Sequence, residues 1–352
     1  MNNEAPWDQI LHIAKNTPSG GNTQPWAVYQ NKNSINVTTD LSSLENASAF
    51  EEMAAFVSIG ALSYNIEQAG RGLGYKITFK VINNETPFIA MQHSEYDKNL
   101  VAPELLLVIN KRCTNRKKSI ANIPLSIIDQ LHRDFYQFVK NEQAPFLKIN
   151  MTREPQLIKK IANIIAEMDV LRFSNLITKK RLFEELKCKE GDAPDKVCID
   201  SLEVPWPLEK MLCLMVSVPF FQKFILSSLI RQMVKKQLSS SSDLGCLFSD
   251  KDLNKQDLIK VGRVLQAFWL KVTEYGYYIQ PWTILSFVAL EKRMHNTSIF
   301  FAEEQDKIEG LIHEFSNCFE ASADIPLFIF RTLDAPKPQC CSTKQEISLR
   351  CS

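Results

Sequence analysis

The chain has 352 residues, of which 45% are hydrophobic and 23% are charged, as is typical of globular proteins. Its formal net charge is +1, which gives no electrostatic reason to expect nucleic acid or a strongly acidic partner. The nine cysteines are scattered and form no Cys-x-x-Cys pair or Cys/His cluster with zinc-ligand spacing. We therefore predict no metal site and a reduced, cytoplasmic compartment. The first residues have neither the basic start nor the apolar core of a signal peptide.

The first predicted element is a helix at Pro6–Lys15, because its apolar residues recur at helical spacing. A proline and two glycines at positions 18–21 end it. The loop Pro18–Trp26 follows, and its hydrogen-bonding side chains are those of Ser19, Asn22, Thr23 and Gln24. Glycines let a backbone approach a flat group, and side-chain amides offer both donors and acceptors. The loop is therefore a candidate ligand contact, and the alternative is an ordinary helix-ending loop with a core tryptophan.

The next elements are a hairpin and a long helix. Alternating apolar and polar residues predict a β-hairpin from Trp26–Gln30 and Ser34–Thr39, with its turn at residues 31–33. A broad apolar face predicts a helix at Glu51–Leu73. Gly60 in its middle costs about 1 kcal/mol relative to alanine, so we expect another helix to approach closely there. Strands are predicted at Lys76–Ile82 and Leu105–Ile109.

A basic cluster, Lys111–Lys118, follows the second of these strands. Arg112 and Arg116 flank Thr114, so two guanidinium groups and a hydroxyl would lie near one point at a strand-to-helix junction. Arginine binds phosphate and carbonyl groups well because its guanidinium group is planar and permanently charged. The alternative is a solvated run of charge.

The second half of the chain contains a region of weak periodicity, at about residues 168–255. Around it, periodicity predicts helices at Ile127–Lys140, Glu154–Met168 and Lys255–Tyr275, and strands at Phe146–Met151 and Asp324–Phe330. The region includes the apolar stretch Met211–Ile230, which Pro219 and Lys223 divide into runs shorter than the roughly 20 residues of a membrane span. A covered helix or hairpin is favoured over contact with a membrane surface.

Two of these segments resemble motifs of the nitroreductase family of flavin enzymes. The loop Pro18-Ser-Gly-Gly-Asn-Thr-Gln-Pro-Trp26 resembles the family's A-P-S-x-x-N-x-Q-P-W loop, which lies against FMN. The segment Arg112-Cys-Thr-Asn-Arg116 resembles the segment R-R-S-x-R that holds the FMN phosphate, ribityl chain and N1/O2 edge, with threonine in place of serine. The resemblance implies that FMN contacts Pro18, Ser19, Asn22, Gln24, Arg112, Cys113, Thr114 and Arg116.

The order of the two motifs resembles the fused, tandem form of this family. The arginine segment lies about ninety residues after the polar loop, whereas ordinary nitroreductases carry it just before that loop. The implied fold is α+β, with two degenerate repeats forming an intramolecular pseudo-dimer of antiparallel or mixed sheets flanked by helices. We expect one complete FMN site, a first repeat at residues 1–108, a second at 109–352 and a lid-like insertion at about 168–255. An extra helical layer without a gating role is the alternative for the insertion, and further association of pseudo-dimers stays open.

The same resemblance implies two further contacts with the cofactor. The helix at Lys255–Tyr275 and the following Gly276 resemble the family's central helix and G-x-x-x-x-P segment, whose backbone faces the flavin N5 and O4. This role falls loosely on Gln280 and Pro281. A C-terminal arginine in this family reaches back to the FMN phosphate, for which Arg350 is the candidate and Arg331 or Lys344 the substitutes.

The implied function is that of an FMN-dependent oxidoreductase, which takes hydride from NAD(P)H and passes electrons to a small-molecule acceptor. Arg116 would stabilise negative charge at the N1/O2 edge, and the backbone near Gln280 would donate a hydrogen bond at N5. One alternative is an FMN-sequestering protein whose insertion blocks the nicotinamide, and another is an adaptor that keeps the fold without the cofactor. The sequence has no glycine-rich phosphate loop, and no histidine lies beside a candidate nucleophile in a known motif.

Overall fold

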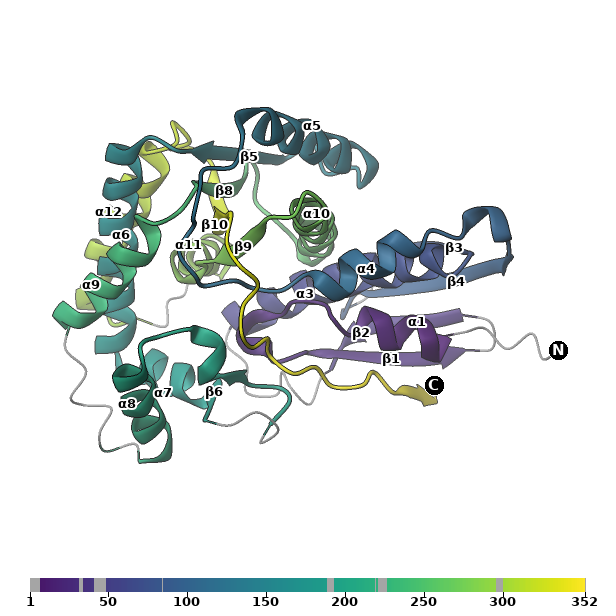
Figure 1. Cartoon of the computed structure of the whole chain (residues 1–352), viewed down its shortest axis with the longest axis horizontal. Coiled ribbons are helices and arrows are strands. Elements are labelled where there is room, and N and C mark those ends of the chain that lie inside the picture. The colour runs from purple at the N-terminus through teal and green to yellow at the C-terminus, as the bar shows by residue number, and fades with distance from the viewer. Residues whose placement is uncertain are drawn as a thin grey trace.

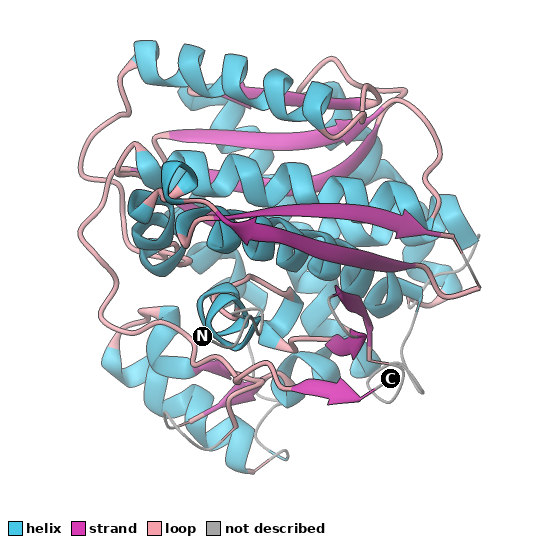
Figure 2. Ribbon diagram, turned by 90° about the vertical axis from the view of Figure 1, so that its right-hand side faces the viewer, coloured by secondary structure: helices cyan, strands magenta, loops and turns pink. Residues whose placement is uncertain are grey.

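The computed structural model describes residues 7–31, 34–40, 49–83, 85–188, 193–218, 220, 227–295 and 300–351. Over these residues the protein has a five-stranded mixed sheet, a four-stranded antiparallel sheet and a two-stranded parallel sheet. Helices lie between and outside the two larger sheets (Figure 1, Figure 2). The expected α+β class is confirmed, whereas the division into two repeats at residue 108 stays a prediction.

The five-stranded sheet has the order β11-β1-β2-β4-β3. Its strands are β1 (Trp26–Asn31), β2 (Ser34–Thr39), β3 (Tyr75–Ile82), β4 (Phe88–Tyr96) and β11 (Leu349–Cys351). The predicted hairpin is confirmed, because β1 and β2 pair antiparallel; residues 32 and 33 of its turn lie outside the described residues. The sequence reasoning identified β3 but neither β4 nor β11. The short β11 pairs in parallel with β1, so the end of the chain returns to the sheet that begins it.

The four-stranded sheet has the order β5-β8-β10-β9. Its strands are β5 (Leu147–Thr152), β8 (Asp243–Ser249), β9 (Tyr278–Pro281) and β10 (Ile325–Leu333). The strands predicted at 146–151 and 324–330 are confirmed as β5 and β10. Every residue of β8 and β10 is buried, because these strands are central and covered on both faces. A strand of this kind shows no alternation of apolar and polar residues, which explains why β8 was not predicted.

Two long helices, α3 (Ala49–Gly72) and α10 (Lys255–Glu274), cross between the sheets (Figure 1). At the crossing, a Cβ added to Gly60 would lie 2.1 Å from the carbonyl oxygen of Ile259. A Cβ added to Gly262 would lie 1.9 Å from the carbonyl oxygen of Val57. Only glycine allows backbones to come this close, so the predicted close approach at Gly60 is confirmed.

Other helices pack beside α3 and α10 or on the opposite face of the four-stranded sheet. They are α1 (Trp7–Ala14), α4 (Pro103–Lys111), α5 (Leu125–Asn141), α6 (Pro155–Ser174), α9 (Ser227–Leu238), α11 (Ile284–His295) and α12 (Ala302–Asn317). The helices predicted from 6–15, 127–140 and 154–168 are confirmed as α1, α5 and α6, with Pro6 outside the described residues. The main core joins residues from α3, α10 and both larger sheets, and a second core lies beneath α6, α9 and α12.

The strand predicted at Leu105–Ile109 is wrong, because these residues belong to the helix α4. Pro103 lies in its first turn, where a backbone N–H has no intrahelical partner in any case. Glu104 in the first turn and Lys111 in the last both suit the helix dipole. Five consecutive apolar residues do not by themselves distinguish a buried strand from a helix. The basic segment therefore begins at the end of a helix, with Arg112 as its C-cap, and not at the end of a strand.

The insertion expected at about residues 168–255 stays a prediction, and the structure describes several separate elements within these bounds. Its last part includes β8, in the middle of the four-stranded sheet, and α9, which packs on α6 in the second core. What remains is a small unit with a core of its own. The unit consists of α7 (Leu176–Glu184), β6 (Leu186–Lys187), β7 (Val197–Cys198), a 3₁₀ turn (Ile199–Leu202) and α8 (Trp206–Ser217).

The apolar stretch Met211–Ile230 divides between the end of α8 and the start of α9, and residues 219 and 221–226 lie outside the described residues. Among the helices that the structure describes, none combines the length and hydropathy needed to cross a bilayer.

Candidate functional site

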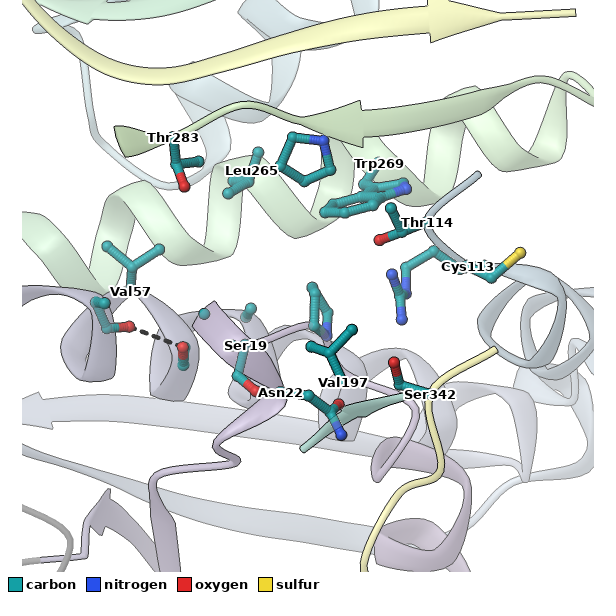
Figure 3. Close-up of a pocket in the computed structure, with 18 of the residues that line it drawn as sticks. Ser19, Asn22, Val57, Cys113, Thr114, Val197, Leu265, Trp269, Thr283 and Ser342 are labelled. Atoms are coloured by element: carbon teal, nitrogen blue, oxygen red, sulfur yellow. Dashed lines mark hydrogen bonds between the residues drawn. The ribbon is translucent and has the colours of Figure 1, made fainter. Parts of the chain in front are cut away.

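A cavity of about 340 Å³ lies between the loop at residues 18–22, the segment 112–116 and the helices α3 and α10 (Figure 3). Residues 335–346, here called the C-terminal segment, run from β10 to β11 (Figure 1), and Cys340, Cys341, Ser342 and Lys344 of this segment line the cavity. Val197 and Ser201 of the small α7–α8 unit line it as well. The two motifs that the sequence singled out thus lie on one cavity.

Three residues of the polar loop have a left-handed backbone conformation. Gly21 (φ 55°), Asn22 (φ 62°) and Gln24 (φ 51°) all lie in the left-handed region, which glycine enters freely and asparagine more readily than most residues. The Ser19 hydroxyl accepts a 3.0 Å hydrogen bond from the backbone N–H of Gln24. Pro18, Ser19 and Asn22 line the cavity, as the sequence predicted for ligand contacts, whereas Gln24 does not.

The amide side chains of this loop bind other parts of the chain. The Asn22 amide nitrogen donates to the carbonyl oxygens of Pro194, Lys196 and Thr343 at 2.9, 3.2 and 3.0 Å. The Gln24 amide nitrogen donates to the carbonyl oxygen of Pro194 at 2.8 Å, and its oxygen accepts from the backbone N–H of Gln345 at 2.8 Å. Both amides therefore join the loop to residues 194–196 and to the C-terminal segment.

Three cations converge on the cavity without an acidic partner. Arg112 is buried, and Arg116 and Lys344 are half-buried. Arg112 donates twice to the carbonyl oxygen of Asn16, at 2.9 and 3.2 Å, and Arg116 donates to that of Ser201 at 2.8 Å. None of the three forms an ion pair with a carboxylate of the described residues within 4 Å. Glu203, beyond ion-pair distance, offsets part of the charge of Arg116, and the Cys341 thiol acts in the same sense on all three groups. The positive charge that remains favours an anionic ligand.

The environment of this cluster is reflected in its pKa values. Burial lowers the pKa of Arg112 to about 10 and that of Arg116 to about 10. Burial also lowers the pKa of Lys344 to about 7, and the neighbouring charge of Arg112 adds to this effect. An anion placed among the three groups would oppose both causes, since it would offset the lost hydration and the mutual repulsion.

The opposite wall of the cavity is apolar. Figure 3 shows Leu265 and Trp269 of α10 facing Ser19, Asn22 and Val197 across the cavity. Val57 and Ala61 of α3, Leu258 and Val261 of α10 and Phe287 of α11 complete this wall. The guanidinium carbon of Arg112 lies 4.9 Å from the centre of the Trp269 ring, so the charged and apolar sides meet there.

The remaining sequence-predicted residues divide into two groups. Cys113, Thr114 and Pro281 line the cavity, and Thr114 bridges to Ile279 of β9. Gln280 and Arg350 do not line it. The Gln280 side chain is buried and accepts a 2.7 Å hydrogen bond from Arg331, and Arg350 is exposed on the edge strand, where it pairs with Asp40 at 2.6 Å.

Sequence reasoning missed most of the C-terminal segment. Lys337, Cys340 and Cys341 line the cavity beside Lys344, and of these the sequence pointed only to Lys344, as a substitute for Arg350. The segment is an irregular coil, so it carries no periodic signal. Trp269 was expected only as part of the apolar face of its helix. The contact of Trp269 with Arg112 depends on how α10 packs against α4. A local sequence pattern does not predict such packing.

Comparisons with known proteins were of three kinds. No family model matches the chain. Among curated proteins, the uncharacterised protein MT1398 of Mycobacterium tuberculosis (strain CDC 1551 / Oshkosh) is 21% identical over an alignment of 347 residues that covers 96% of this chain and 47% of that protein. Among solved structures, the FMN-dependent nitroreductase NfnB from Mycobacterium smegmatis, in complex with NADPH, is similar at a TM-score of 0.35 and 11% identity, over 64% of this chain and 84% of that one. The chain spans about half the length of the curated relative that it matches.

Proposed function

We propose that the cavity binds FMN and that the protein is an FMN-dependent oxidoreductase of the nitroreductase type, which passes electrons from NAD(P)H to a small-molecule acceptor. The observation that supports this best is a cavity in which Arg112, Arg116 and Lys344, none of them in an ion pair with a described carboxylate, meet an apolar wall. Arg112 and Arg116 come from one of the segments in which the sequence resembles that family, and Leu265 and Trp269 come from another.

The residues present fit FMN chemically. The phosphate of FMN would bring negative charge to three cations that have no carboxylate within ion-pair distance. Its flat ring system would cover the apolar wall formed by α3, α10 and Trp269. The cavity, at about 340 Å³, falls in the range of about 300–1,000 Å³ that small-molecule sites occupy.

FMN, when bound, would supply the hydride chemistry that amino-acid side chains do not provide. The chain's own residues would bind and orient it. Arg112 and Lys344 would hold the phosphate, and the fixed charge of Arg116 would stabilise negative charge that develops near it. Pro281 has no N–H to donate, and the Gln280 side chain is bonded to Arg331. Gln280 is therefore assigned the positioning of β9 and not contact with the cofactor.

A second candidate, an FMN-sequestering protein, is favoured by one feature of the site. Asn22 and Gln24 bond both to residues 194–196 and to the C-terminal segment, so two separate parts of the chain are held over the polar loop. If these parts stay in place when FMN is bound, a nicotinamide would have no access to the ring.

One experiment separates these functions. The purified protein is reconstituted with FMN, freed of excess cofactor, and mixed anaerobically with NADH or NADPH while visible absorbance is recorded. Loss of the flavin bands on mixing supports the oxidoreductase, and retained FMN that neither nucleotide bleaches supports sequestration. A protein that remains colourless after reconstitution contradicts both.

A further inference from the structure

Two cysteines from distant parts of the chain meet at the cavity. Cys113 follows Arg112 in the basic segment, and Cys341 belongs to the C-terminal segment; both line the cavity. Each thiol shifts the pKa of the other. The bonds of Asn115 to Pro336 and of Lys344 to Asn22 hold the C-terminal segment at the cavity on either side of Cys341. Formation of a disulfide would require the two sulfur atoms to approach to about 2 Å.

The two thiols differ in charge and in exposure. The neighbouring Cys113 thiol lowers the pKa of Cys341 to about 6, against the effect of burial, and Arg112 and Lys337 lower it further while Glu203 opposes them. In the opposite direction, Cys341 and burial raise the pKa of Cys113. Cys341 is exposed, whereas Cys113 is only 7% exposed. Cys341 thus has the accessible, thiolate-forming character of an attacking cysteine, and Cys113 has the protected character of a resolving one.

We propose that Cys113 and Cys341 are a redox-active pair whose reversible disulfide joins the C-terminal segment covalently to the basic segment. With a low-molecular-weight disulfide as oxidant, the Cys341 thiolate attacks one of its sulfur atoms and displaces one thiolate. Cys113 then loses its proton and attacks Cys341 in the mixed disulfide, which releases the second thiol. One small disulfide is reduced to two thiols, and two protein thiols are oxidised to one disulfide. This step needs no bound flavin, so it is independent of the proposed oxidoreductase activity.

The disulfide would act on a segment that is otherwise held by non-covalent contacts at the cavity. Asn115 donates to the carbonyl oxygen of Pro336 at 2.9 Å, and Lys117 donates to that of Lys337 at 2.7 Å. Asn22 and Lys344 hold its far end through the 2.6 Å hydrogen bond between their side chains. A covalent bond at Cys341, between these contacts, would keep the segment closed over the cavity and keep Lys344 among the cations.

The chain contains a matched control pair in the small α7–α8 unit. Cys188 and Cys213 also lie together, with the Cys188 thiol donating to the carbonyl oxygen of Cys213 at 3.5 Å. Burial, Cys188, Glu209 and Asp200 all raise the pKa of Cys213, and no cation contributes. If contact alone were enough, both pairs would oxidise equally. If the surrounding positive charge determines reactivity, only Cys113 and Cys341 will react readily.

The test uses the full-length, ligand-free protein equilibrated with mixtures of oxidised and reduced glutathione. Remaining thiols are alkylated, and peptides are mapped by mass spectrometry without reduction. The expected product is a Cys113–Cys341 cross-link that forms at least about tenfold faster than any Cys188–Cys213 link. It should be absent from Cys341→Ser and unchanged in Cys188→Ser. Hydrogen exchange of residues 336–346 should slow on oxidation in the wild type but not in Cys341→Ser.

Two other products would overturn the proposal. One is a glutathione adduct on Cys341 that persists without resolution, and the other is a link between Cys341 and the adjacent Cys340. A separate measurement tests whether the surrounding charge activates Cys341. The alkylation rate of Cys341 in the reduced protein should reach half its maximum near pH 6. Lys337→Ala should move that midpoint to higher pH, and an unchanged midpoint would show that the surrounding charge does not activate Cys341.

Discussion

Lys344 donates a 2.6 Å hydrogen bond to the side-chain oxygen of Asn22, a residue 322 positions earlier in the chain. The contact joins the C-terminal segment to the polar loop at the edge of the cavity. It gives Asn22 a different role from the one that the sequence motif implies, because the amide holds protein segments together. It also brings a third cation to Arg112 and Arg116.

Substitution of Asn22 by alanine should loosen two segments at once. The amide donates to three carbonyl oxygens and accepts from Lys344, and each lost hydrogen bond is worth about 1 kcal/mol. Hydrogen exchange should accelerate in residues 193–198 and 341–346 while α3 and α10 remain protected. Thr23→Ala, in the same loop, is the control, because its hydroxyl bonds only locally to Gly20. Equal exchange in the two variants would contradict the bridging role of Asn22.

Affinity for FMN should fall as the pH rises above about 7. Lys344, whose pKa is lowered to about 7 by burial and by Arg112, against an opposing effect of Cys341, loses its proton there in the free protein. At higher pH an anion must therefore bind together with a proton, which weakens binding by up to about tenfold per pH unit. Calorimetry in buffers of different ionisation enthalpy should detect proton uptake at about pH 8. Lys344→Met should lose both the uptake and the slope, and an affinity independent of pH in the wild type would contradict this account.

The crossing of α3 and α10 should tolerate no side chain at Gly262. Alanine there would place its Cβ 1.9 Å from the carbonyl oxygen of Val57, and the backbone cannot yield as a flexible side chain can. We expect Gly262→Ala to lower the free energy of unfolding by at least about 2 kcal/mol, as measured by urea denaturation. Gly310→Ala, in the exposed part of α12 with nothing within 4 Å of the added Cβ, should instead stabilise the protein by up to about 1 kcal/mol. A Gly262→Ala protein as stable as the wild type would disprove the close crossing.

The sequence predicted the elements whose residues repeat with a clear period. The helix containing Gly60, the hairpin at 26–39 and the helix at 255–275 were all identified, because the apolar residues of each recur at a regular spacing. The strand β8 was missed since it is buried on both faces, and α4 was mistaken for a strand since its apolar run is only five residues long. Both errors concern segments in which tertiary packing, and not local pattern, decides the structure.

The sequence pointed to those residues of the candidate site that belong to local motifs. Pro18, Ser19, Arg112 and Arg116 lie on one cavity, although the two motifs are far apart in the sequence. Arg350 does not reach it, because the pairing of β11 with β1 places that side chain beside Asp40. Lys344 and Cys341 come from an irregular segment whose path depends on contacts at both ends, and such contacts leave no signal in a short stretch of sequence.

The most direct test of the FMN site is an equilibrium titration of the full-length protein with FMN, followed by quenching of flavin fluorescence. Wild-type protein should bind one FMN per chain. Arg112→Ala should bind it about 10- to 100-fold more weakly, as expected for the loss of a charge-assisted hydrogen bond. Arg350→Ala, the control arginine paired with Asp40, should bind like the wild type. Wild-type protein that does not quench FMN, or equal loss of affinity in the two variants, would contradict the assignment of this cavity.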